Sequence, residues 1–388
     1  MSLSTQLVTF APPATKIRVA ILSSALCDAL GGPAEFSPRF SFDFVSSMIP
    51  NENFGLGKGV WTDDTSMTLA LARSLATFGG EGGFDEGDQL HAYHRWFRTG
   101  ELSAINRCFD IGNTTRTALS CYHPPTSNNQ PEMKAQAASK ALKRIAKELR
   151  GASLGGNGSL MRVLPIGLAY YQRSPEEVRE LARRSSAVTH PNAVCQEACA
   201  VWSEAVARVV RSASEGTNMT KLDVLHHFAS YPYQTEALRK ALTASEPSAT
   251  ADEAHYAKHH PLLRLTGFLN LTPESPAAQT DVAARIISLL PQSKALPSSG
   301  YVVHTLVAAL YAFLVTETFE DGAMLVVNMG SDADTVAAVY GGLAGAWYGT
   351  DQAEFWTERV CGWRDDLVKR NVVEEVAEEL VTFATKSS

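Results

Sequence analysis

The amino-acid sequence predicts an all-α fold built as one compact domain. Runs that alternate apolar and polar residues with period two are scarce, and no regular alternation of strands and helices occurs. Apolar side chains instead recur at helical spacing, as in Met67, Leu71 and Leu75. No internal repeat of about 20–50 residues is visible, which argues against a solenoid. The 388 residues are enough to bury a large core.

Helices are expected wherever an apolar stripe is bounded by caps or breakers. The first covers residues 16–30 and ends at Gly31-Gly32-Pro33, a strong helix stop. Others are expected at residues 61–78, 88–99, 116–122, 135–149, 160–171, 175–186, 192–210, 301–313, 319–329, 336–349, 352–359 and 365–385. Between residues 214 and 292, proline and Ser/Thr clusters favour short helices joined by loops.

One domain accounts for residues 16–388. Residues 1–15 are expected to form a flexible tail rather than a signal peptide, because no positively charged region precedes an apolar one. Residues near 124–150 and 212–292 are interpreted as insertions into this domain that could reshape access to a site.

Bulk composition narrows the functional classes. The formal net charge of −7 argues against a nucleic-acid binder, which usually carries a basic face. No apolar run approaches the roughly 18 residues that span a bilayer. The six cysteines form no CxxC pair, which favours buried thiols in a reducing compartment over disulfides or zinc. We therefore expect an intracellular, cytoplasmic monomer that binds neither membrane nor nucleic acid.

Two short acidic clusters stand out, each just before an apolar helical pattern. They are Thr62-Asp63-Asp64-Thr65 and Ser331-Asp332-Ala333-Asp334-Thr335. Asp and Thr are common N-caps, and the positive end of a helix dipole favours carboxylates, so capping alone could explain either cluster. One helix needs only one cap, however, and the pattern occurs twice.

We expect these two clusters to meet in space and to hold metal ions. Carboxylates that converge at a packed junction repel one another unless they are protonated or bridged by cations. Oxygen ligands suit hard ions such as Mg²⁺ or Mn²⁺, whereas zinc would recruit His or Cys. Neither cluster matches an EF-hand loop. Two adjacent ions can bind a diol, position a water and lower its pKa.

Glycines follow the second cluster at four-residue spacing, at Gly341, Gly345 and Gly349. Glycine destabilises a helix by about 1 kcal/mol relative to alanine. Its repeated use therefore predicts a close backbone approach to another helix, and we assign these glycines a structural role.

The sequence contains further motifs in addition to the two acidic clusters. In order, the whole set is Asp28-Ala29-Leu30-Gly31 with Glu35-Phe36, Thr62-Asp63-Asp64-Thr65, Phe109-Asp110-Ile111-Gly112-Asn113-Thr114, Gly156-Asn157-Gly158-Ser159-Leu160-Met161-Arg162, Thr189-His190, Ser299-Gly300-Tyr301-Val302-Val303 and Gly330-Ser331-Asp332-Ala333-Asp334-Thr335. With these motifs, which run from about Val19 to Gly349, the sequence resembles the ADP-ribosylglycohydrolases, in particular the branch of the dinitrogenase reductase-activating glycohydrolase. Any one motif is weak, whereas the set in the family's order is specific.

The resemblance implies a compact all-α fold around a binuclear site for two Mg²⁺ or Mn²⁺ ions. The metal ligands implied by position are Thr62, Asp63, Asp64, Asp332, Asp334 and Thr335. In such enzymes the ions bind the 2″ and 3″ hydroxyls of the distal ribose of an ADP-ribosyl group, and the bond at C1″ is hydrolysed.

Two further acids take catalytic roles by this resemblance. Glu35 matches an acidic residue on a mobile loop beside the metals, and its position after a Gly-Gly-Pro stop is consistent with a loop that closes. Asp110 matches a catalytic carboxylate of the arginine-directed branch. Flanked by Phe109 and Ile111, it would be a costly buried acid unless paired. Which of the two acts as general base stays open.

Substrate-binding roles are implied for a glycine-rich loop and three later positions. The loop residues are Gly156, Asn157, Gly158, Ser159, Met161 and Arg162. Free N–H groups where a loop enters a helix suit a diphosphate, although turn chemistry alone also explains such a loop. His190 and Gly300 are expected in the ligand pocket, and Tyr301 either stacks on a base or fills the core.

Two positions depart from the family's pattern. Cys27 stands where the family usually has a glycine before the aspartate, here Asp28, so the helix packing at this position is expected to differ. His304 stands where the family commonly has an aspartate, so the hydrogen bonds around the metal ligands are expected to differ.

The sequence therefore predicts a metal-dependent ADP-ribosyl hydrolase that releases ADP-ribose from an ADP-ribosylated protein or small molecule, with arginine linkage preferred. Serine-linked or other O-linked ADP-ribose is the alternative substrate. A different class, an inactive ADP-ribose-binding or crystallin-like structural protein, is disfavoured because all six ligand positions and Glu35 are present. An unrelated di-metal phosphohydrolase would leave the glycine-rich loop unexplained.

Overall fold

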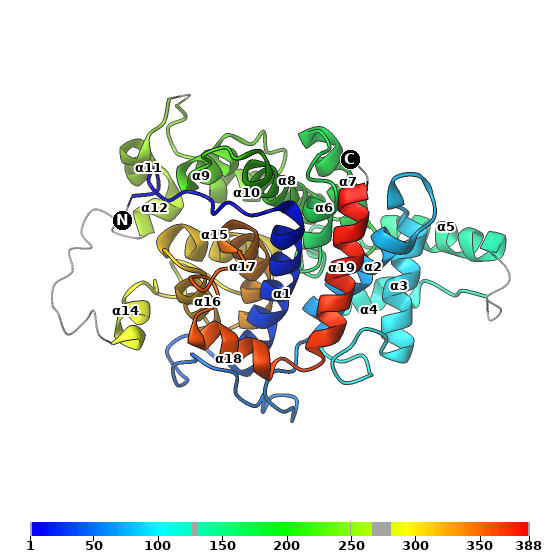
Figure 1. Cartoon of the computed structure of the whole chain (residues 1–388). Coiled ribbons are helices and arrows are strands. Elements are labelled where there is room, and N and C mark those ends of the chain that lie inside the picture. The colour runs from blue at the N-terminus through cyan, green and yellow to red at the C-terminus, as the bar shows by residue number, and fades with distance from the viewer. Residues whose placement is uncertain (1, 126–130, 249, 266–280, 387–388) are drawn as a thin grey trace.

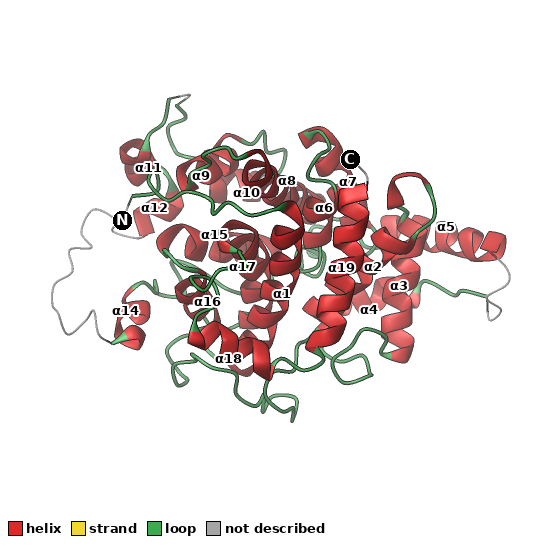
Figure 2. Cartoon of the chain, viewed as in Figure 1, coloured by secondary structure: helices red, strands yellow, loops and turns green. Residues whose placement is uncertain are grey.

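A computed structural model shows a helical protein (Figure 1, Figure 2) and describes residues 2–125, 131–248, 250–265 and 281–386. Within these ranges there is no β-sheet, and extended segments pair only at isolated bridges, such as the one between Gly156 and Tyr301. The predicted all-α class is confirmed.

The helices of the first half are α1 (Pro13–Gly31), η1 (Gly32–Ala34), α2 (Asp63–Thr77), η2 (Glu81–Gly83), α3 (Glu86–Thr99), α4 (Asn113–Ser120), α5 (Pro131–Glu148), α6 (Leu164–Ala169), α7 (Pro175–Ala187) and α8 (Ala193–Glu215). Those of the second half are α9 (Lys221–Ser230), α10 (Glu236–Leu242), α11 (Glu253–His259), α12 (Pro261–Leu265), α14 (Val282–Ser288), α15 (Val302–Val315), α16 (Phe319–Val327), α17 (Ala333–Tyr348), α18 (Glu358–Asp366) and α19 (Arg370–Lys386).

Two helix predictions were wrong. The helix expected at 160–171 begins only at α6, because the amides of Leu160 and Met161 both donate to the Asn157 carbonyl and form turns instead. The helix expected at 352–359 is a turn. α18 begins where this turn ends, and the Thr357 hydroxyl accepts the Val360 amide as its N-cap.

The centre of the fold is the pair formed by α1 and α17, with α19 lying beside α1 (Figure 1). A Cβ at Gly341 would lie 2.5 Å from the Ser23 carbonyl oxygen and 2.9 Å from Cys27 Sγ. A Cβ at Gly345 would lie 2.9 Å from the Cα of Ala20. The predicted close helix approach is confirmed, and the thiol of Cys27 fits because Gly341 faces it.

Among the described residues, Pro13–Ala34 is the one helical stretch long and apolar enough, by length and composition, to cross a membrane. The sequence analysis had expected no such stretch. It is interrupted by few charges, and 89% of its most apolar window is buried inside the fold. Its contacts with α17 and α19 make it the core helix of this protein.

The N-terminal segment, expected to be a flexible tail, packs against the domain from residue 2 onward. Leu3 and Val8 are buried. The Val8 amide donates to the Met219 carbonyl at 2.9 Å, and the Thr9 amide donates to the Trp347 carbonyl at 3.1 Å. Residue 1 lies outside the described residues.

The two expected insertions are also helical where they are described. In the first, α5 projects from the edge of the molecule (Figure 1) and packs on α3 through Ala138, Ala141 and Ile145. The second contributes α9 to α12 and α14, of which α10 contacts α8 and α15. Residues 126–130, 249 and 266–280 of these insertions lie outside the described residues.

All six cysteines are free thiols, as expected. Cys195 and Cys199 share one face of α8 and lie behind the glycine-rich loop. The Cys195 thiol contacts the Gly156 carbonyl at 3.3 Å, and the Cys199 thiol contacts the Ser159 hydroxyl at 3.5 Å. They serve as small buried side chains.

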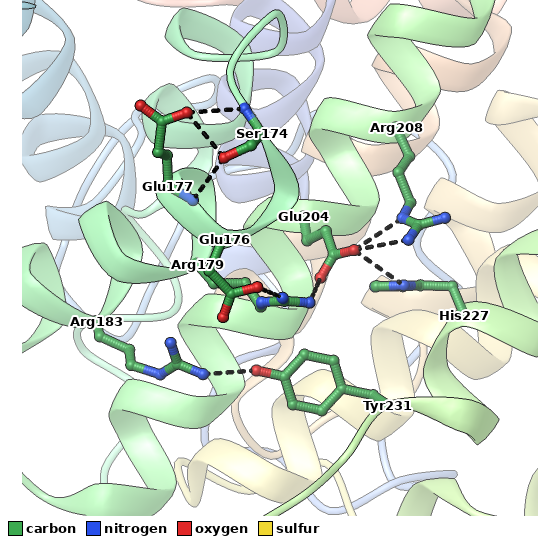
Figure 3. A network of polar contacts seen from close by, with 9 residues as sticks. All are labelled: Ser174, Glu176, Glu177, Arg179, Arg183, Glu204, Arg208, His227 and Tyr231. Atoms are coloured by element: carbon green, nitrogen blue, oxygen red, sulfur yellow. Dashed lines mark hydrogen bonds and ion pairs between the residues drawn. The ribbon is translucent and has the colours of Figure 1, made fainter.

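A buried ion-pair network joins α7, α8 and α9 (Figure 3). Glu204 on α8 is 1% exposed. It accepts hydrogen bonds from Arg179 of α7 at 2.9 Å and from Arg208, one turn further along α8, at 2.8 and 2.9 Å. His227 of α9 lies 3.7 Å from the same carboxylate. This buried acid is therefore paired with two permanent cations, the largely buried Arg179 and the exposed Arg208. We call these four residues the Glu204 network.

Candidate active site

The first turns of α2 and α17 meet beside the last turn of α1. A Cβ at Gly31 would lie 2.6 Å from the Cα of Asp334 and 2.7 Å from the Ala333 carbonyl oxygen. Only a glycine allows so close an approach of backbones. The two acidic clusters, some 270 residues apart in the sequence, are thereby brought together as expected.

One cavity of about 300 Å³ opens at this junction. Its wall consists of Glu35, Phe36, Asp63, Asp64, Asp110, Gly112, Asn113, Thr114, Thr115, Gly156, Asn157, Gly158, Met161, His190, Gly300, Asp332, Asp334 and Thr335. Both acidic clusters, both expected catalytic acids and most of the expected substrate-binding residues thus face a single space.

Five of the six expected metal ligands line this cavity, and Thr62 lies one step behind them. Its hydroxyl contacts Asp28 Oδ1 at 2.9 Å and Asp64 Oδ2 at 3.2 Å. The hydroxyl of Thr335 donates to the same Asp64 oxygen at 3.2 Å. The capping alternative is not supported, because neither Thr62 nor Asp332 makes a side-chain cap hydrogen bond.

Asp28 is a site residue that the sequence analysis did not assign. Its carboxylate accepts the amides of Thr62 and Thr65 and both of their hydroxyls, at 2.5 to 3.1 Å. It therefore fixes the start of α2 from outside the helix. The one acid in the mostly apolar segment 16–30 was the signal that the sequence offered.

The acids of this cavity are buried against one another. Burial raises the pKa of Asp63, Asp64 and Asp334 well above the usual range, and the neighbouring carboxylates raise it further. Burial also raises the pKa of Asp332 to about 6, although hydrogen bonds from Asn157 and Thr335 oppose the shift. The positive ends of two helices face the site, yet they do not balance this charge.

The residues fit a pair of hard cations. Oxygens of Asp28, Asp64 and Asp334 lie within 4.8 Å of one another, and so do oxygens of Glu35, Asp332 and Asp334. The two groups share Asp334. Buried Asp64 Oδ1 and Glu35 Oε2 have no hydrogen-bond partner. Orphaned carboxylate oxygens in a set without His or Cys match the ligand preference of Mg²⁺ or Mn²⁺.

The Glu35 loop is fastened to the second acidic cluster by its backbone. The Phe36 amide donates to the Ser331 carbonyl at 2.6 Å, and the Ser331 amide donates to the Ser37 carbonyl at 2.8 Å. Gly330 has a φ of 66°, and a Cβ there would lie 2.4 Å from the Ser37 carbonyl oxygen. These two backbone hydrogen bonds hold Glu35, which is 3% exposed, beside the carboxylates of the second acidic cluster.

Arg39 anchors the same loop on its other side. Its guanidinium donates to the carbonyls of Met329 at 3.0 Å and Leu296 at 2.8 Å, and to the Ser298 hydroxyl at 3.2 Å. The Ser298 carbonyl in turn accepts the Asp332 amide at 3.0 Å. Arg39 was not singled out from the sequence, because its partners are some 250 to 290 residues away.

The two expected catalytic acids sit at the cavity with perturbed pKa values. Burial raises the pKa of Glu35 to about 12, with Asp334, Asp110 and Asp332 adding to the shift. Burial and nearby Asp28 and Asp332 raise the pKa of Asp110 to about 7. Asp110 has a φ of 53°, a strained conformation for a non-glycine residue and one often found at functional sites.

The glycine-rich loop contributes an orienting amide. Asn157 Nδ2 donates to Asp332 Oδ2 at 2.5 Å and to the Thr305 hydroxyl at 2.8 Å, so it holds the Asp332 carboxylate in place. A Cβ at Gly158 would lie 2.9 Å from His190 Cε1, which explains the glycine. Burial lowers the pKa of His190 to about 3, so that this ring is neutral.

Three expected substrate-binding residues lie outside the cavity wall. Ser159 is buried behind the loop, where its hydroxyl accepts from Ser186 at 2.8 Å. Arg162 is buried and donates to the Gly158 carbonyl at 2.5 Å, so it supports the loop from behind. Tyr301 packs on Gly155 and on the ring of His304, and its stacking on a base stays a prediction. His304 itself contacts the Ser299 hydroxyl at 2.7 Å.

The comparison with known proteins agrees with this geometry. The family model described as ADP-ribosylglycohydrolase matches residues 11–387. The chain belongs to the ADP-ribosylglycohydrolase family. The chain is 31% identical over 354 residues to the ADP-ribosylarginine hydrolase Tri1 of Pseudomonas putida (strain GB-1). The aligned residues are 90% of this chain and 75% of the relative.

Two further similarities extend over most of this ADP-ribosylglycohydrolase. The ADP-ribosyl-[dinitrogen reductase] glycohydrolase of Rhodospirillum rubrum is 26% identical over 336 residues, which are 86% of this chain and 85% of that one. A solved structure described as an ADP-ribosylglycohydrolase-related protein complex superposes with a TM-score of 0.64 at 29% identity. The superposition covers 96% of this chain and 99% of the other.

Proposed function

We propose that this protein is a Mg²⁺- or Mn²⁺-dependent hydrolase that releases ADP-ribose from ADP-ribosylated arginine. The observation that carries the proposal is the convergence of six acidic residues on one cavity. Two of their buried oxygens lack any hydrogen-bond partner. A fold does not keep such unbalanced charge for stability alone, because each uncompensated buried carboxylate is destabilising.

Two cations would be held by the expected ligand set. It comprises Thr62, Asp63, Asp64, Asp332, Asp334 and Thr335. When bound, such ions polarise the vicinal ribose hydroxyls and lower the pKa of an adjacent water. Asp28 holds the Thr62–Thr65 segment, and Asn157 holds Asp332, so these two residues position ligands for both ions.

The reaction is hydrolysis of the bond between C1″ and the arginine nitrogen. A water oxygen bonds to C1″, the C1″–N bond breaks, and the leaving guanidine takes up a proton. Glu35 and Asp110 both face the cavity, and their raised pKa values suit groups that hold or pass a proton. The Glu35 loop, fixed by Ser331 and Arg39, holds Glu35 at the cavity.

Arginine linkage is supported by charge and by the relatives. The guanidinium of ADP-ribosylated arginine is cationic, and this cavity is lined by acids. The Pseudomonas putida relative carries the name of an ADP-ribosylarginine hydrolase. A serine linkage is uncharged and gains nothing from Glu35 and Asp110, the two acids of the cavity wall that are outside the expected ligand set.

The test is the release of ADP-ribose from arginine-linked and serine-linked ADP-ribosyl peptides, with Mg²⁺, with Mn²⁺ or with EDTA. Release from the arginine-linked peptide that EDTA abolishes is expected. Asp63→Asn and Asp332→Asn should abolish turnover while the circular dichroism spectrum stays helical, and Glu204→Gln serves as the buried-acid control. Faster release from the serine-linked peptide would overturn the linkage, and no release from either would overturn the enzyme function.

A further inference from the structure

An exposed aromatic ring stands directly beside the candidate catalytic carboxylate. Phe36 follows Glu35, lines the cavity and is 65% exposed. Its φ of 62° is a strained conformation for a bulky side chain, at a cost of about 1–2 kcal/mol. The hydrogen bond from its amide to the Ser331 carbonyl holds the backbone in this conformation. The protein thus keeps a phenyl ring at the cavity mouth although folding gains little from it.

Two more rings continue from Phe36 to the second catalytic acid. The ring centroids of Phe36 and Phe54 are 6.2 Å apart, and those of Phe54 and Phe109 are 5.7 Å apart, both with edge-on geometry. Phe109 immediately precedes Asp110. We call Phe36, Phe54 and Phe109 the aromatic rim.

Phe36 is the ring of the aromatic rim that lines the cavity, and Phe54 and Phe109 continue from it outside the cavity wall. Asn53, next to Phe54, donates through Nδ2 to the Glu35 carbonyl at 2.9 Å. Each candidate catalytic acid therefore has a phenylalanine as its chain neighbour, and the third ring bridges them. An exposed ring in a cavity wall of carboxylates suits a flat, delocalised cation, since guanidinium groups both pair with carboxylates and stack on rings.

We propose that the aromatic rim is the acceptor subsite, which holds the guanidinium of the ADP-ribosylated arginine and the polypeptide that carries it. This rests on the proposed function and names the part of the substrate on the leaving-group side of the scissile bond. The ADP-ribose portion lies on the other side, against Asn157 and Gly158. A serine acceptor offers neither positive charge nor a planar group, so the rim contributes to the choice of linkage.

The experiment measures kcat/KM for matched arginine-linked and serine-linked ADP-ribosyl peptides, together with inhibition by free ADP-ribose. The variants are Phe36→Ala, Phe54→Ala and Phe36→Leu, the last of which keeps apolar bulk without a ring. Phe40→Ala is the matched control, because Phe40 is 50% exposed with a φ of 67° on the same loop but does not line the cavity. Thermal unfolding verifies that each variant is folded.

Phe36→Ala should lower the arginine-to-serine ratio of kcat/KM by about 5- to 10-fold, mainly through KM. Phe54→Ala removes the ring next to Phe36 rather than part of the cavity wall and should lower this ratio less. The arginine-to-serine ratio of Phe36→Leu should lie between those of Phe36→Ala and wild type. Inhibition by ADP-ribose should stay within about twofold, and Phe40→Ala should match wild type. An unchanged ratio in an active Phe36→Ala overturns this inference and leaves the proposed function intact. A loss of inhibition by ADP-ribose as large as the loss in the kcat/KM ratio also overturns this inference and leaves the proposed function intact. An inactive wild type overturns both.

Discussion

Two sites in this protein bury acids to the same extent and treat them in opposite ways. Glu204 and Asp64 are each 1% exposed. Glu204 receives hydrogen bonds from two guanidinium groups, those of Arg179 and Arg208 (Figure 3). Asp64 instead faces Asp28, Asp63 and Asp334, keeps one oxygen without a partner, and has a pKa raised well above its usual range.

The difference separates a structural site from a functional one. A buried acid with cationic partners is complete within the chain, because its charge is balanced by groups of the same fold. A buried acid among other acids is incomplete within the chain and is balanced only by something that binds. Both sites bury a carboxyl group to the same exposed fraction, so the missing counter-charge is the feature that marks the candidate active site.

The largest expected effect is on turnover. Asp64→Asn should lower kcat/KM for the arginine-linked peptide by about 10³-fold, because it removes a ligand of the cations that stabilise the transition state. Glu204→Gln, assayed at a temperature where it is folded, should stay within about twofold of wild type. Comparable losses in the two variants would contradict the division into a functional and a structural site.

The next effect concerns folding at the paired site. Glu204→Gln should lower the free energy of unfolding by about 3 kcal/mol, because the buried carboxylate accepts charge-assisted hydrogen bonds from Arg179 and Arg208 that a neutral amide accepts less strongly. Urea denaturation followed by circular dichroism measures this loss. A change below about 1 kcal/mol would show that the Glu204 network contributes little.

Cation binding should stabilise the wild-type protein. At a free Mn²⁺ or Mg²⁺ concentration about 100 times the dissociation constant, a single site adds about 2.7 kcal/mol to the free energy of unfolding. In the same titration, Asp64→Asn should gain much less free energy of unfolding than wild type. Glu204→Gln should gain as much as wild type. Thermal unfolding as a function of ion concentration follows all three proteins.

A smaller effect is expected from His227 in the Glu204 network. Burial lowers its pKa to about 4, although Glu204 opposes the shift, and its Nε2 lies 3.1 Å from the Val201 carbonyl. In the unfolded chain a histidine binds its proton below about pH 6.5, whereas the folded protein binds it only near pH 4. Stability should therefore fall as pH drops through this window. Between pH 6.5 and 5.5, wild type should lose about 1 kcal/mol more than His227→Gln. Equal slopes in urea denaturation would contradict this assignment.

Helices and their close packing were predictable because they depend on local pattern. The spacing of Gly341 and Gly345 predicted the approach of α17 to another helix, although it did not reveal that the partner is α1. The turn at 352–357 and the late start of α6 were missed. There the apolar pattern continues, but tertiary contacts and turns such as that at Asn157 prevail over it.

The candidate site was predictable where its residues cluster in sequence. Asp63 and Asp334 stand among other acids at helix starts, so their density was visible. Asp28 and Arg39 were not assigned, because their roles depend on contacts with segments far along the chain. Phe36 was named within a motif, but its exposure and its ring contact with Phe54 exist only in the fold.

The central claim is that the candidate site carries negative charge that the chain does not balance. It is tested most directly by the free energy of unfolding of Asp64→Asn in EDTA. We predict that this variant is about 1 kcal/mol more stable than wild type, because a neutral amide replaces a carboxyl group that the fold must either bury charged or protonate, and the amide can donate to neighbouring carboxylates. A loss of about 3 kcal/mol, like that expected for Glu204→Gln, would show that Asp64 is balanced within the fold and would contradict the account.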